Sequence, residues 1–251
     1  AENPEVDWLY FPGCFKGFDD RNKKVAMALV KILQQMGISF GILGPEEGCC
    51  GDPARRMGNE YLYSMLVQKN LETFERYKVK KILTTCPHCY NTLKNEYPQF
   101  GGNLEVIHQT EFLKTLLDQK KMVLHNGSSL TVTYHDSCYL GRYNQIYEPQ
   151  REILKAIPGV TLKEMERSHD RSFCCGGGGG RMWMEEHQGK RINEMRVDQA
   201  LALQPDVIAT ACPYCLTMLE DGLKARGKDD SVKVYDIAEL LERSISGTGV
   251  K

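Results

Sequence analysis

The sequence predicts an α/β fold made of two tandem repeats, each with a small, mostly parallel sheet flanked by helices. Two observations predict it. Short apolar runs alternate with longer segments of helical periodicity along the chain, which is typical of parallel α/β architecture. In addition, the ten cysteines form two sets of five with the same spacing and similar neighbours. We expect the repeats to span residues 1–126 and 127–251 and to be related by a pseudo-two-fold axis.

The first repeat carries four apolar runs with helical segments between them. The runs predict strands at 7–11, 39–43, 81–85 and 105–108. Helical periodicity is present at 20–36, 58–77, 87–97 and 110–118. The first of these helices places Val25, Leu29 and Ile32 on one face, and Gly37 ends it.

The second repeat shows the same alternation. Its predicted strands lie at 130–134, 161–164, 206–210 and 232–235. Its predicted helices lie at 150–156, 181–203, 213–225 and 236–244. The charged tract 185–196 is interpreted as the solvated face of a helix. Cys14, Cys86, Cys138 and Cys212 each follow the end of a predicted strand, where ligands of parallel sheets gather, so we expect the cysteines of each repeat to converge.

Charge and hydropathy exclude several classes of protein. The 251-residue chain carries 32 Lys and Arg against 33 Asp and Glu, which argues against a nucleic-acid partner bound through bulk charge. No stretch approaches the roughly 18 consecutive apolar residues of a membrane helix, and the acidic start lacks a signal-peptide pattern. We expect a cytoplasmic protein, or one held at the cytoplasmic face of a membrane by a segment or partner outside this chain. Because the chain does not begin with Met, we also expect it to be processed or part of a longer protein.

The cysteines of the two repeats occupy equivalent positions. In chain order they are Cys14, Cys49, Cys50, Cys86 and Cys89, followed by Cys138, Cys174, Cys175, Cys212 and Cys215. Each member of the second set lies about 125 residues after its counterpart, and the motifs Cys-Cys-Gly and Cys-Pro-x-Cys both occur twice. In a chain without a secretion signal, grouped cysteines indicate metal binding or redox chemistry before structural disulfides.

Several kinds of site compete for these cysteines. A Cys-Pro-x-Cys motif between a strand and a helix is typical of dithiol oxidoreductases, because the helix N-terminus stabilises a thiolate. That interpretation leaves the adjacent Cys-Cys pairs unexplained. A structural zinc site takes four ligands, whereas each repeat offers five. Haem attachment requires His directly after Cys-x-x-Cys, but Tyr90 and Leu216 stand there.

An iron–sulfur cluster in each repeat accounts for all ten cysteines, because thiolates bind iron and a cluster can collect ligands from several loops. Five thiolates exceed the four corners of a cubane, so either one cysteine is spare or the cluster is not a cube. Pro87 and Pro213 suit the first helical position, whose helix N-terminus would face an anionic cluster. Glycines after each Cys-Cys pair would let backbone N–H groups approach sulfur. These glycines are Gly51, Gly176, Gly177 and Gly178.

The pattern Cys14 … Cys49-Cys50-Gly51 … Cys86-Pro87-x-Cys89 and its second copy from Cys138 to Cys215 resemble the cysteine-rich CCG domain of heterodisulfide reductase B- and D-type subunits. The resemblance covers nearly the whole chain. It implies that each five-cysteine set holds one non-cubane [4Fe-4S] cluster, two in all. The flanks 51–56, 135–142 and 176–183 are similar to membrane-linked members of the electron-transfer flavoprotein:menaquinone type.

From this resemblance we expect an iron–sulfur oxidoreductase module. It would carry electrons between an iron–sulfur or flavin redox subunit and a disulfide or quinone acceptor. In the membrane-linked branch, a membrane segment and a ferredoxin-like domain precede the CCG domains, and this chain shows neither, so a membrane-anchored region or subunit would lie outside it. Two alternatives stay open: a non-catalytic electron-transfer subunit with relay clusters, and a cluster-free dithiol oxidoreductase.

Polar residues next to the cysteines are the candidates for chemistry. His135, Asp136 and Arg142 flank Cys138 and would supply a proton source and an anion holder, whereas residues 11–13 before Cys14 are apolar. We therefore expect chemistry to be biased to the second centre and electrons to enter at the first. Further candidates for tuning a centre or offsetting its charge are His88, Arg55, Arg56 and Arg181.

Overall fold

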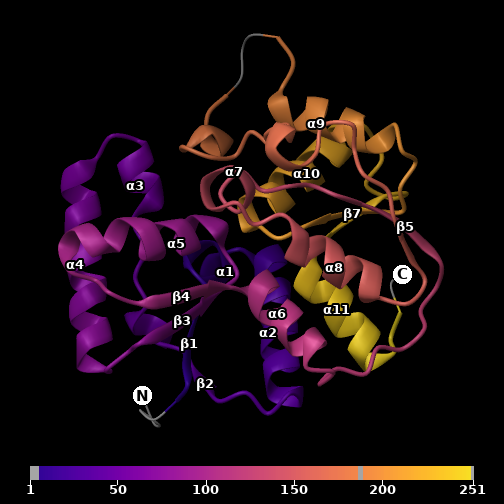
Figure 1. The fold of residues 1–251 in the computed structure, drawn as a ribbon. Coiled ribbons are helices and arrows are strands. Elements are labelled where there is room, and N and C mark those ends of the chain that lie inside the picture. The colour runs from indigo at the N-terminus through magenta and orange to yellow at the C-terminus, as the bar shows by residue number, and fades with distance from the viewer. Residues whose placement is uncertain (1–5, 186–188, 250–251) are drawn as a thin grey trace. The chain divides into compact units, whose positions relative to one another are not determined.

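Each half of the chain builds its own four-stranded parallel sheet, as the alternating pattern predicts. The computed structural model describes residues 6–185 and 189–249. Two compact units, Ala1–Phe112 and Leu113–Lys251, divide the chain within helix α6 (Gln109–Asp118) (Figure 1). This division comes before the predicted repeat boundary at residue 126, which stays a prediction. None of the described helices is both long and apolar enough to cross a membrane.

The sheet of the first unit has the order β2-β1-β3-β4, with all strands parallel. Its strands are β1 (Trp8–Phe11), β2 (Phe40–Gly41), β3 (Lys81–Thr84) and β4 (Glu105–His108). The helices that follow them include α1 (Cys14–Phe18), α2 (Asp20–Gln35), α3 (Asp52–Arg56), α4 (Glu60–Arg76) and α5 (Pro87–Asn91). Helix α2 begins where the Asp19 carboxylate accepts the N–H of Asn22, and it buries Val25, Leu29 and Ile32 as predicted.

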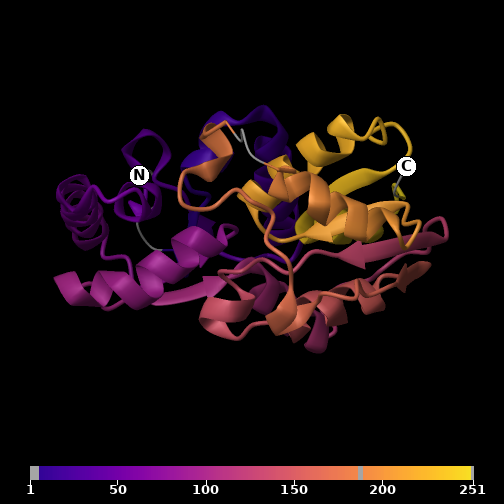
Figure 2. The same ribbon diagram turned by 90° about the horizontal axis from the view of Figure 1, so that it is seen from above.

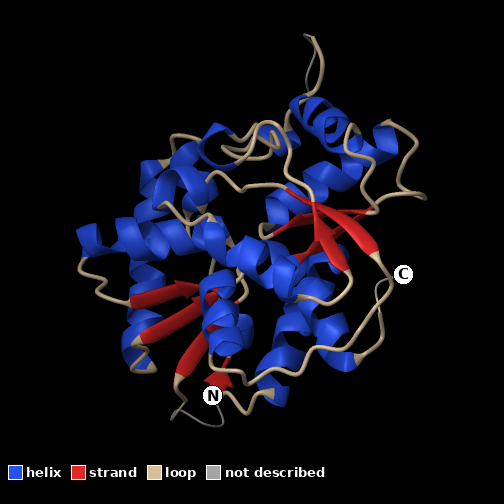
Figure 3. Ribbon diagram, turned by 45° about the vertical axis from the view of Figure 1, so that its right-hand side comes forward, coloured by secondary structure: helices blue, strands red, loops and turns tan. Residues whose placement is uncertain are grey.

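The second unit repeats this architecture with the order β6-β5-β7-β8. Its strands are β5 (Leu130–Tyr134), β6 (Val160–Leu162), β7 (Val207–Thr210) and β8 (Lys233–Asp236). Its helices are α7 (Gly141–Asn144), α8 (Glu148–Ala156), α9 (Ile192–Leu201), α10 (Pro213–Ala225) and α11 (Ile237–Ser246). Helices α8 and α11 pack together on one side of the strands, and α9 and α10 pack together on the other (Figures 1 and 2). Figure 3 shows a group of adjacent strands with helices beside it in each unit.

The strand order creates a topological switch point at the carboxyl end of each sheet. In the first unit the connection after β1 leads to β2 on one side of the sheet. The connection after β3, the other neighbour of β1, leads to β4 on the opposite side, so the two connections diverge. Strands β5 and β7 have the same relation in the second unit. The register pairs Phe11 with Thr84 and Tyr134 with Ala209, so the neighbouring strands end together. Ligands of open parallel sheets bind at such switch points, and the cysteine-bearing loops leave from these strand ends.

The observed helices differ from the predicted ones in three places. The single helix predicted at 181–203 is wrong, because Arg181–Trp183 form a 3-10 turn, Gly189 has a φ of 70° that a helix cannot contain, and α9 begins at Ile192. Residues 186–188 of that prediction lie outside the described residues. The segment predicted as one helix at 87–97 ends as a π-helical turn and then a 3-10 turn. Helices α1, α3 and α7 have only four or five residues, too few to show a helical period in the sequence.

Candidate metal centres

Five thiols converge in the first unit at the carboxyl end of its sheet. Cys14 opens α1 after β1, and Cys86 and Cys89 flank the start of α5 after β3. Cys49 and Cys50 come from the loop between β2 and α3. The thiols lie within hydrogen-bonding reach of one another in the order Cys14, Cys49, Cys50, Cys89, Cys86. The sheet topology thus brings residues from three separate loops to one point.

The five thiols of the second unit meet in the same way. Their order of contact is Cys138, Cys174, Cys175, Cys215, Cys212, and the Sγ atoms of Cys175 and Cys215 lie 3.3 Å apart. All ten cysteines are free of disulfides. Both predicted sets therefore form compact groups of free thiols in the described structure.

One thiol of each group is strongly acidified. Hydrogen bonds from Cys14 and Cys50, and from the N–H of Gly51, lower the pKa of Cys49 to about 3. The corresponding contacts from Cys138, Cys175 and Gly176 lower the pKa of Cys174 to about 2. The contact with the ionised Cys49, followed by burial, raises the pKa of Cys14. Each group therefore stabilises one thiolate by itself, and further thiolates require a bound cation.

Backbone shape at the Cys-Cys pairs depends on glycine. Gly51 has a φ of 93° and Gly176 a φ of 86°. In this left-handed conformation the N–H of each glycine donates to the sulfur of the first cysteine of the pair, Cys49 or Cys174. Gly177 packs against Tyr214 and Met218, where an added Cβ would lie 3.7 Å from Cys175 Sγ. Gly178 begins the turn that leads to Arg181. Of the predicted glycines, Gly51 and Gly176 contact a thiol directly.

Buried positive charge lies beside both groups. The Lys16 side chain is 2% exposed, and its Nζ donates to the Thr85 carbonyl at 3.1 Å, next to Cys86. Arg196 in α9 is 0% exposed and lies near the Cys175 and Cys215 thiols. Soft sulfur donors in sets of five, with N–H groups and buried cations around them, fit an anionic iron–sulfur cluster in each unit.

Acidic and basic residues surround the first centre, contrary to the apolar surroundings expected from residues 11–13. Burial raises the pKa of Glu47 to about 8, and its Oε1 accepts the N–H of Gly13 at 2.8 Å. His88 is buried, and its Nδ1 lies 2.7 Å from Oδ2 of Asp52. The first centre therefore has a protonatable carboxyl and a histidine–carboxylate pair within reach.

Two of the predicted arginines belong to an ion-pair network in the first unit. Arg55 Nη1 donates to Glu96 at 2.8 Å, and Arg56 contacts both Glu96 and Asp52. Arg55 also lies over the Tyr63 ring, 4.6 Å from its centre. These guanidinium groups connect α3 to the π-helical turn at 92–96.

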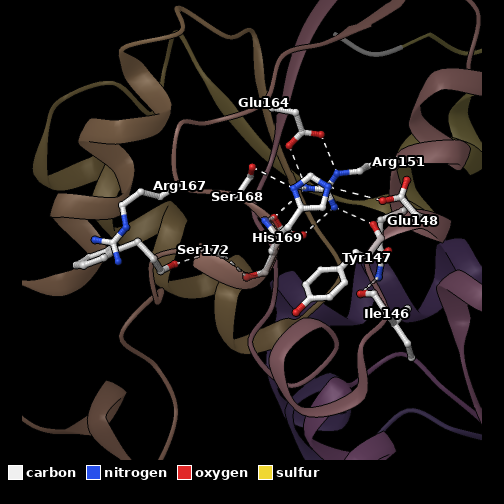
Figure 4. A network of polar contacts seen from close by, with 12 residues as sticks. Ile146, Tyr147, Glu148, Arg151, Glu164, Arg167, Ser168, His169 and Ser172 are labelled. Atoms are coloured by element: carbon white, nitrogen blue, oxygen red, sulfur yellow. Dashed lines mark hydrogen bonds and ion pairs between the residues drawn. The ribbon is translucent and has the colours of Figure 1, made fainter.

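Asp136 pairs with an arginine in the second unit instead of facing the thiols. Arg151 is 2% exposed and donates to both Asp136 oxygens at 2.8 and 2.9 Å. It also donates to Glu164, a contact that Figure 4 shows. Although burial disfavours a charged carboxyl, these contacts with Arg151 keep the pKa of Asp136 below its ordinary value. The N–H of His169 donates to the same carboxylate at 2.8 Å. An ionised carboxylate held in this way has no proton to donate at neutral pH.

His135 is buried beside the second thiol group, whereas Arg142 lies at the surface. His135 is 1% exposed, and a ring nitrogen lies within 4.8 Å of the Cys175 and Cys215 sulfurs. Burial, followed by the charge of Arg196, lowers the pKa of His135 to about 3, so the ring is neutral. Arg142 is exposed and donates to the Ser172 carbonyl at 2.8 Å. It lines an open pocket of about 460 Å³ together with Glu166, Arg167, Asp170 and Arg171.

Several residues of these surroundings were not predicted from the sequence. They are Lys16, Glu47, Asp52, Arg151 and Arg196. Lys16, Glu47 and Asp52 each lie two residues from a cysteine, a spacing that could have drawn attention to them. Arg151 and Arg196 are far from any cysteine in the chain, and only their burial distinguishes them from surface arginines. Arg181, which was predicted, is exposed.

Comparison with known proteins agrees with two equivalent cysteine centres. The CCG family model, described as a cysteine-rich domain, matches residues 8–94 and 132–220. The chain is 52% identical over its whole length to the probable iron-sulfur-binding oxidoreductase FadF of Bacillus subtilis and covers 36% of that protein. It is 51% identical, over 97% of its length, to the EtfAB:quinone oxidoreductase of Syntrophomonas wolfei and covers 35% of it.

A more distant relative is the D-type subunit of the dihydromethanophenazine:CoB–CoM heterodisulfide reductase of Methanosarcina barkeri. It is 35% identical over 96% of this chain, which covers 59% of that relative. The chain thus spans about a third of the length of its two more similar relatives and under two thirds of this one. Because both family matches contain a complete five-cysteine group at a sheet switch point, the chain belongs to the cysteine-rich CCG domain family and carries two copies of that domain.

Proposed function

We propose that each thiol group holds one iron–sulfur cluster and that the chain is the electron-carrying module of a heterodisulfide-reductase-type oxidoreductase. The observation that carries this proposal is the convergence of five free thiols on one switch point in each unit. The first ligand set is Cys14, Cys49, Cys50, Cys86 and Cys89. The second is Cys138, Cys174, Cys175, Cys212 and Cys215. As the resemblance to the CCG domain of heterodisulfide reductase subunits implies, we propose clusters of the non-cubane [4Fe-4S] type, which would use all five thiolates of each set.

The residues around each group suit one-electron chemistry. Iron–sulfur clusters accept and release single electrons at potentials set by charge, hydrogen bonds and solvent exposure. Three cysteines of each group are buried, which keeps water away from most of the sulfur. The Gly51 and Gly176 N–H groups donate to sulfur, and Lys16 and Arg196 add positive charge nearby. Together these contacts favour the more negative, reduced form of each centre.

We propose a disulfide or a quinone as the electron acceptor and an iron–sulfur or flavin protein as the donor. The support is that the relatives are an EtfAB:quinone oxidoreductase and one component of a heterodisulfide reductase. Their greater length supports a further domain or subunit beside this module, and the name of another relative, the probable membrane-anchored ferredoxin of Chromohalobacter salexigens, supports a membrane anchor for it. Arg142, in the open pocket with Arg167 and Arg171, is proposed to hold an anionic group of the acceptor. His135 and Asp136 then serve to position other groups, because neither holds a proton that it can readily release.

The decisive experiment is the iron and acid-labile sulfide content of the anaerobically purified chain. Two four-iron clusters predict about eight irons and about eight sulfides per chain. The EPR spectrum of the reduced protein should show two paramagnetic centres. An iron-free protein that still reduces a disulfide would overturn the proposal and would favour a dithiol mechanism at the Cys-Pro-x-Cys motifs.

A further inference from the structure

A buried histidine–arginine pair lies beside the second thiol group, and nothing in the proposed electron transfer requires it. His135 follows β5, Arg196 lies in the middle of α9, and both side chains are at most 1% exposed. The Nε of Arg196 donates to Nδ1 of His135 at 2.9 Å. The two residues are far apart in the chain, so the fold alone brings this pair to the sulfurs.

Arg196 donates its other hydrogen bonds to uncharged groups as well. Its Nη1 donates to the Arg167 carbonyl at 2.9 Å and to the Gln199 side chain at 2.8 Å, and its Nη2 donates to Ser172 Oγ at 3.4 Å. Within residues 6–185 and 189–249, no carboxylate forms an ion pair with it. A buried guanidinium without a paired anion is costly, so the negative charges of Asp136 and of the neighbouring thiol group would stabilise it.

The contact with Arg196 determines which nitrogen of His135 carries the proton. An arginine Nε–H can only donate, so Nδ1 of His135 must accept, and a neutral ring then carries its proton on Nε2. The Cys175 and Cys215 sulfurs lie within 4.8 Å of a ring nitrogen. The Nε2–H is the remaining polar group of the ring, and sulfur is the acceptor that this neighbourhood offers.

The first repeat has an uncharged counterpart to this pair, without a histidine. Phe11 occupies the place of His135 in the aligned sequence, and Asn70 occupies the place of Arg196. Phe11 packs edge-on against Phe74, with ring centres 6.2 Å apart, and Asn70 donates to the Cys49 carbonyl and to Tyr97. The same position in the fold therefore carries an aromatic contact in one unit and a hydrogen-bond donor in the other.

We propose that Arg196 and His135 form a positioning pair that donates one hydrogen bond to the sulfur of the second centre and raises its reduction potential. Arg196 orients the ring and fixes its tautomer, and the Nε2–H stabilises the additional negative charge of the reduced state. This inference rests on the proposed iron–sulfur function. The first centre, with Phe11 in the equivalent place, lacks this donor.

The test measures the reduction potential of each centre in the iron-loaded chain by EPR-monitored titration. His135→Phe copies the first repeat, and His135→Gln keeps an N–H donor at a similar reach. His125→Phe is the control, because His125 is exposed and precedes β5 at the opposite end of the strand. We expect His135→Phe to lower the equilibrium constant for reduction of the second centre about tenfold. This change lowers its reduction potential by about 59 mV for one electron. We expect His135→Gln to recover part of this shift, and the first centre and the control to be unchanged.

Pulsed EPR in D₂O gives an independent measurement. The unmodified chain should show one exchangeable hydrogen coupled to the second centre in addition to that of the Gly176 N–H, and His135→Phe should lose this additional hydrogen while keeping the one from Gly176. Because this variant leaves Arg196 without its acceptor, the double variant His135→Phe/Arg196→Asn reproduces the first repeat and removes the unpaired cation.

The possible results separate the two proposals. An unmodified chain without iron would overturn the proposed function. Iron-loaded variants with an unchanged potential of the second centre would overturn the pair's tuning role alone. Loss of the second cluster from all His135 variants, while the control keeps it, would also overturn the tuning role. The pair would then be needed for assembly of the cluster rather than for setting its potential.

Discussion

Gly13 shows how one residue can determine the shape of a cysteine group. It precedes Cys14 with a φ of 80°, a conformation that favours glycine, and an added Cβ would lie 2.9 Å from Cys89 Sγ. Its N–H also donates to Glu47. The residue therefore allows the backbone to approach the thiols more closely than any larger side chain would permit.

We predict that Gly13→Ala removes the first cluster and leaves the second. The new methyl group would displace Cys89 and strain the backbone, so iron should fall from about eight to about four per chain. Gly17→Ala is the matched control, because Gly17 lies in helix α1, which Gly13 directly precedes, and an added Cβ there meets no atom within 4 Å. Full iron content in Gly13→Ala would contradict the close approach that the structure shows.

His108 gives a prediction about pH. Burial, followed by the charge of Lys16, lowers the pKa of His108 to about 3 from 6.5. Between these values the unfolded chain binds a proton that the folded chain does not, so the free energy of unfolding falls as the pH drops below about 6.5. His108 contributes stability above that pH and loses it progressively in acid.

We expect His108→Phe to lose less stability than the unmodified protein between pH 7 and pH 5. The difference should be about 2 kcal/mol, from roughly 1.4 kcal/mol per pH unit below the unfolded pKa. Phenylalanine can keep the edge-on contact that His108 makes with Tyr90. Denaturant unfolding at the two pH values measures the effect, and the exposed His125→Phe serves as control. An equal change in the free energy of unfolding in His108→Phe and the unmodified protein would show that His108 does not titrate in this way.

At the scale of elements, the contact between α9 and α10 holds the second thiol group together. Helix α10 begins after Cys212 and carries Cys215, and α9 carries Arg196. Gly222 lets the two helices approach, since an added Cβ would lie 2.7 Å from a Val197 methyl and 3.1 Å from the Asn193 carbonyl. Helix propensity alone would favour alanine at this position.

We predict that Gly222→Ala destabilises the protein by about 1–3 kcal/mol, as overpacking of a close contact does. Thermal or denaturant unfolding would measure the change. Gly17→Ala again provides the contrast, because an exposed helical glycine with open space should gain rather than lose stability. A stabilised Gly222→Ala variant would mean that α9 and α10 do not pack this closely.

At the scale of the whole molecule, the chain contains two thiol groups, each within its own unit. Every cysteine of the first set belongs to Ala1–Phe112 and every cysteine of the second to Leu113–Lys251. We therefore expect each proposed cluster to assemble and to be reduced as a separate centre.

Cys50→Ser and Cys175→Ser test this separation, because these residues occupy equivalent places in the repeat. Each variant should lose one EPR signal and about half of the iron, and should keep the other signal. Comparison of the two spectra would also assign each signal to a unit. Disappearance of both signals from a single variant would show that the two sets build one shared site.

The fold class, the repeat and the identity of the cysteine groups follow from the order of residues. Two sets of five cysteines with matching neighbours, after apolar runs in an alternating pattern, predict parallel sheets with thiols at their carboxyl ends, and both sheets are present. These features are local or periodic, so they can be read from the order of residues. Strand β4 and helix α10 agree with their predicted bounds because apolar periodicity and a Pro at the helix start act over a few residues.

The surroundings of the thiols depend on contacts between residues that are distant in the chain. Asp136 looked like a proton donor beside Cys138, but the fold turns it toward Arg151, and the charged tract that looked solvated contains the fully buried Arg196. Glu47 likewise gives the first centre a protonatable carboxyl that the apolar residues 11–13 do not indicate. The physical reason is that the charge state and role of a polar group depend on burial and on partners distant in the chain, whereas the sequence shows only its near neighbours.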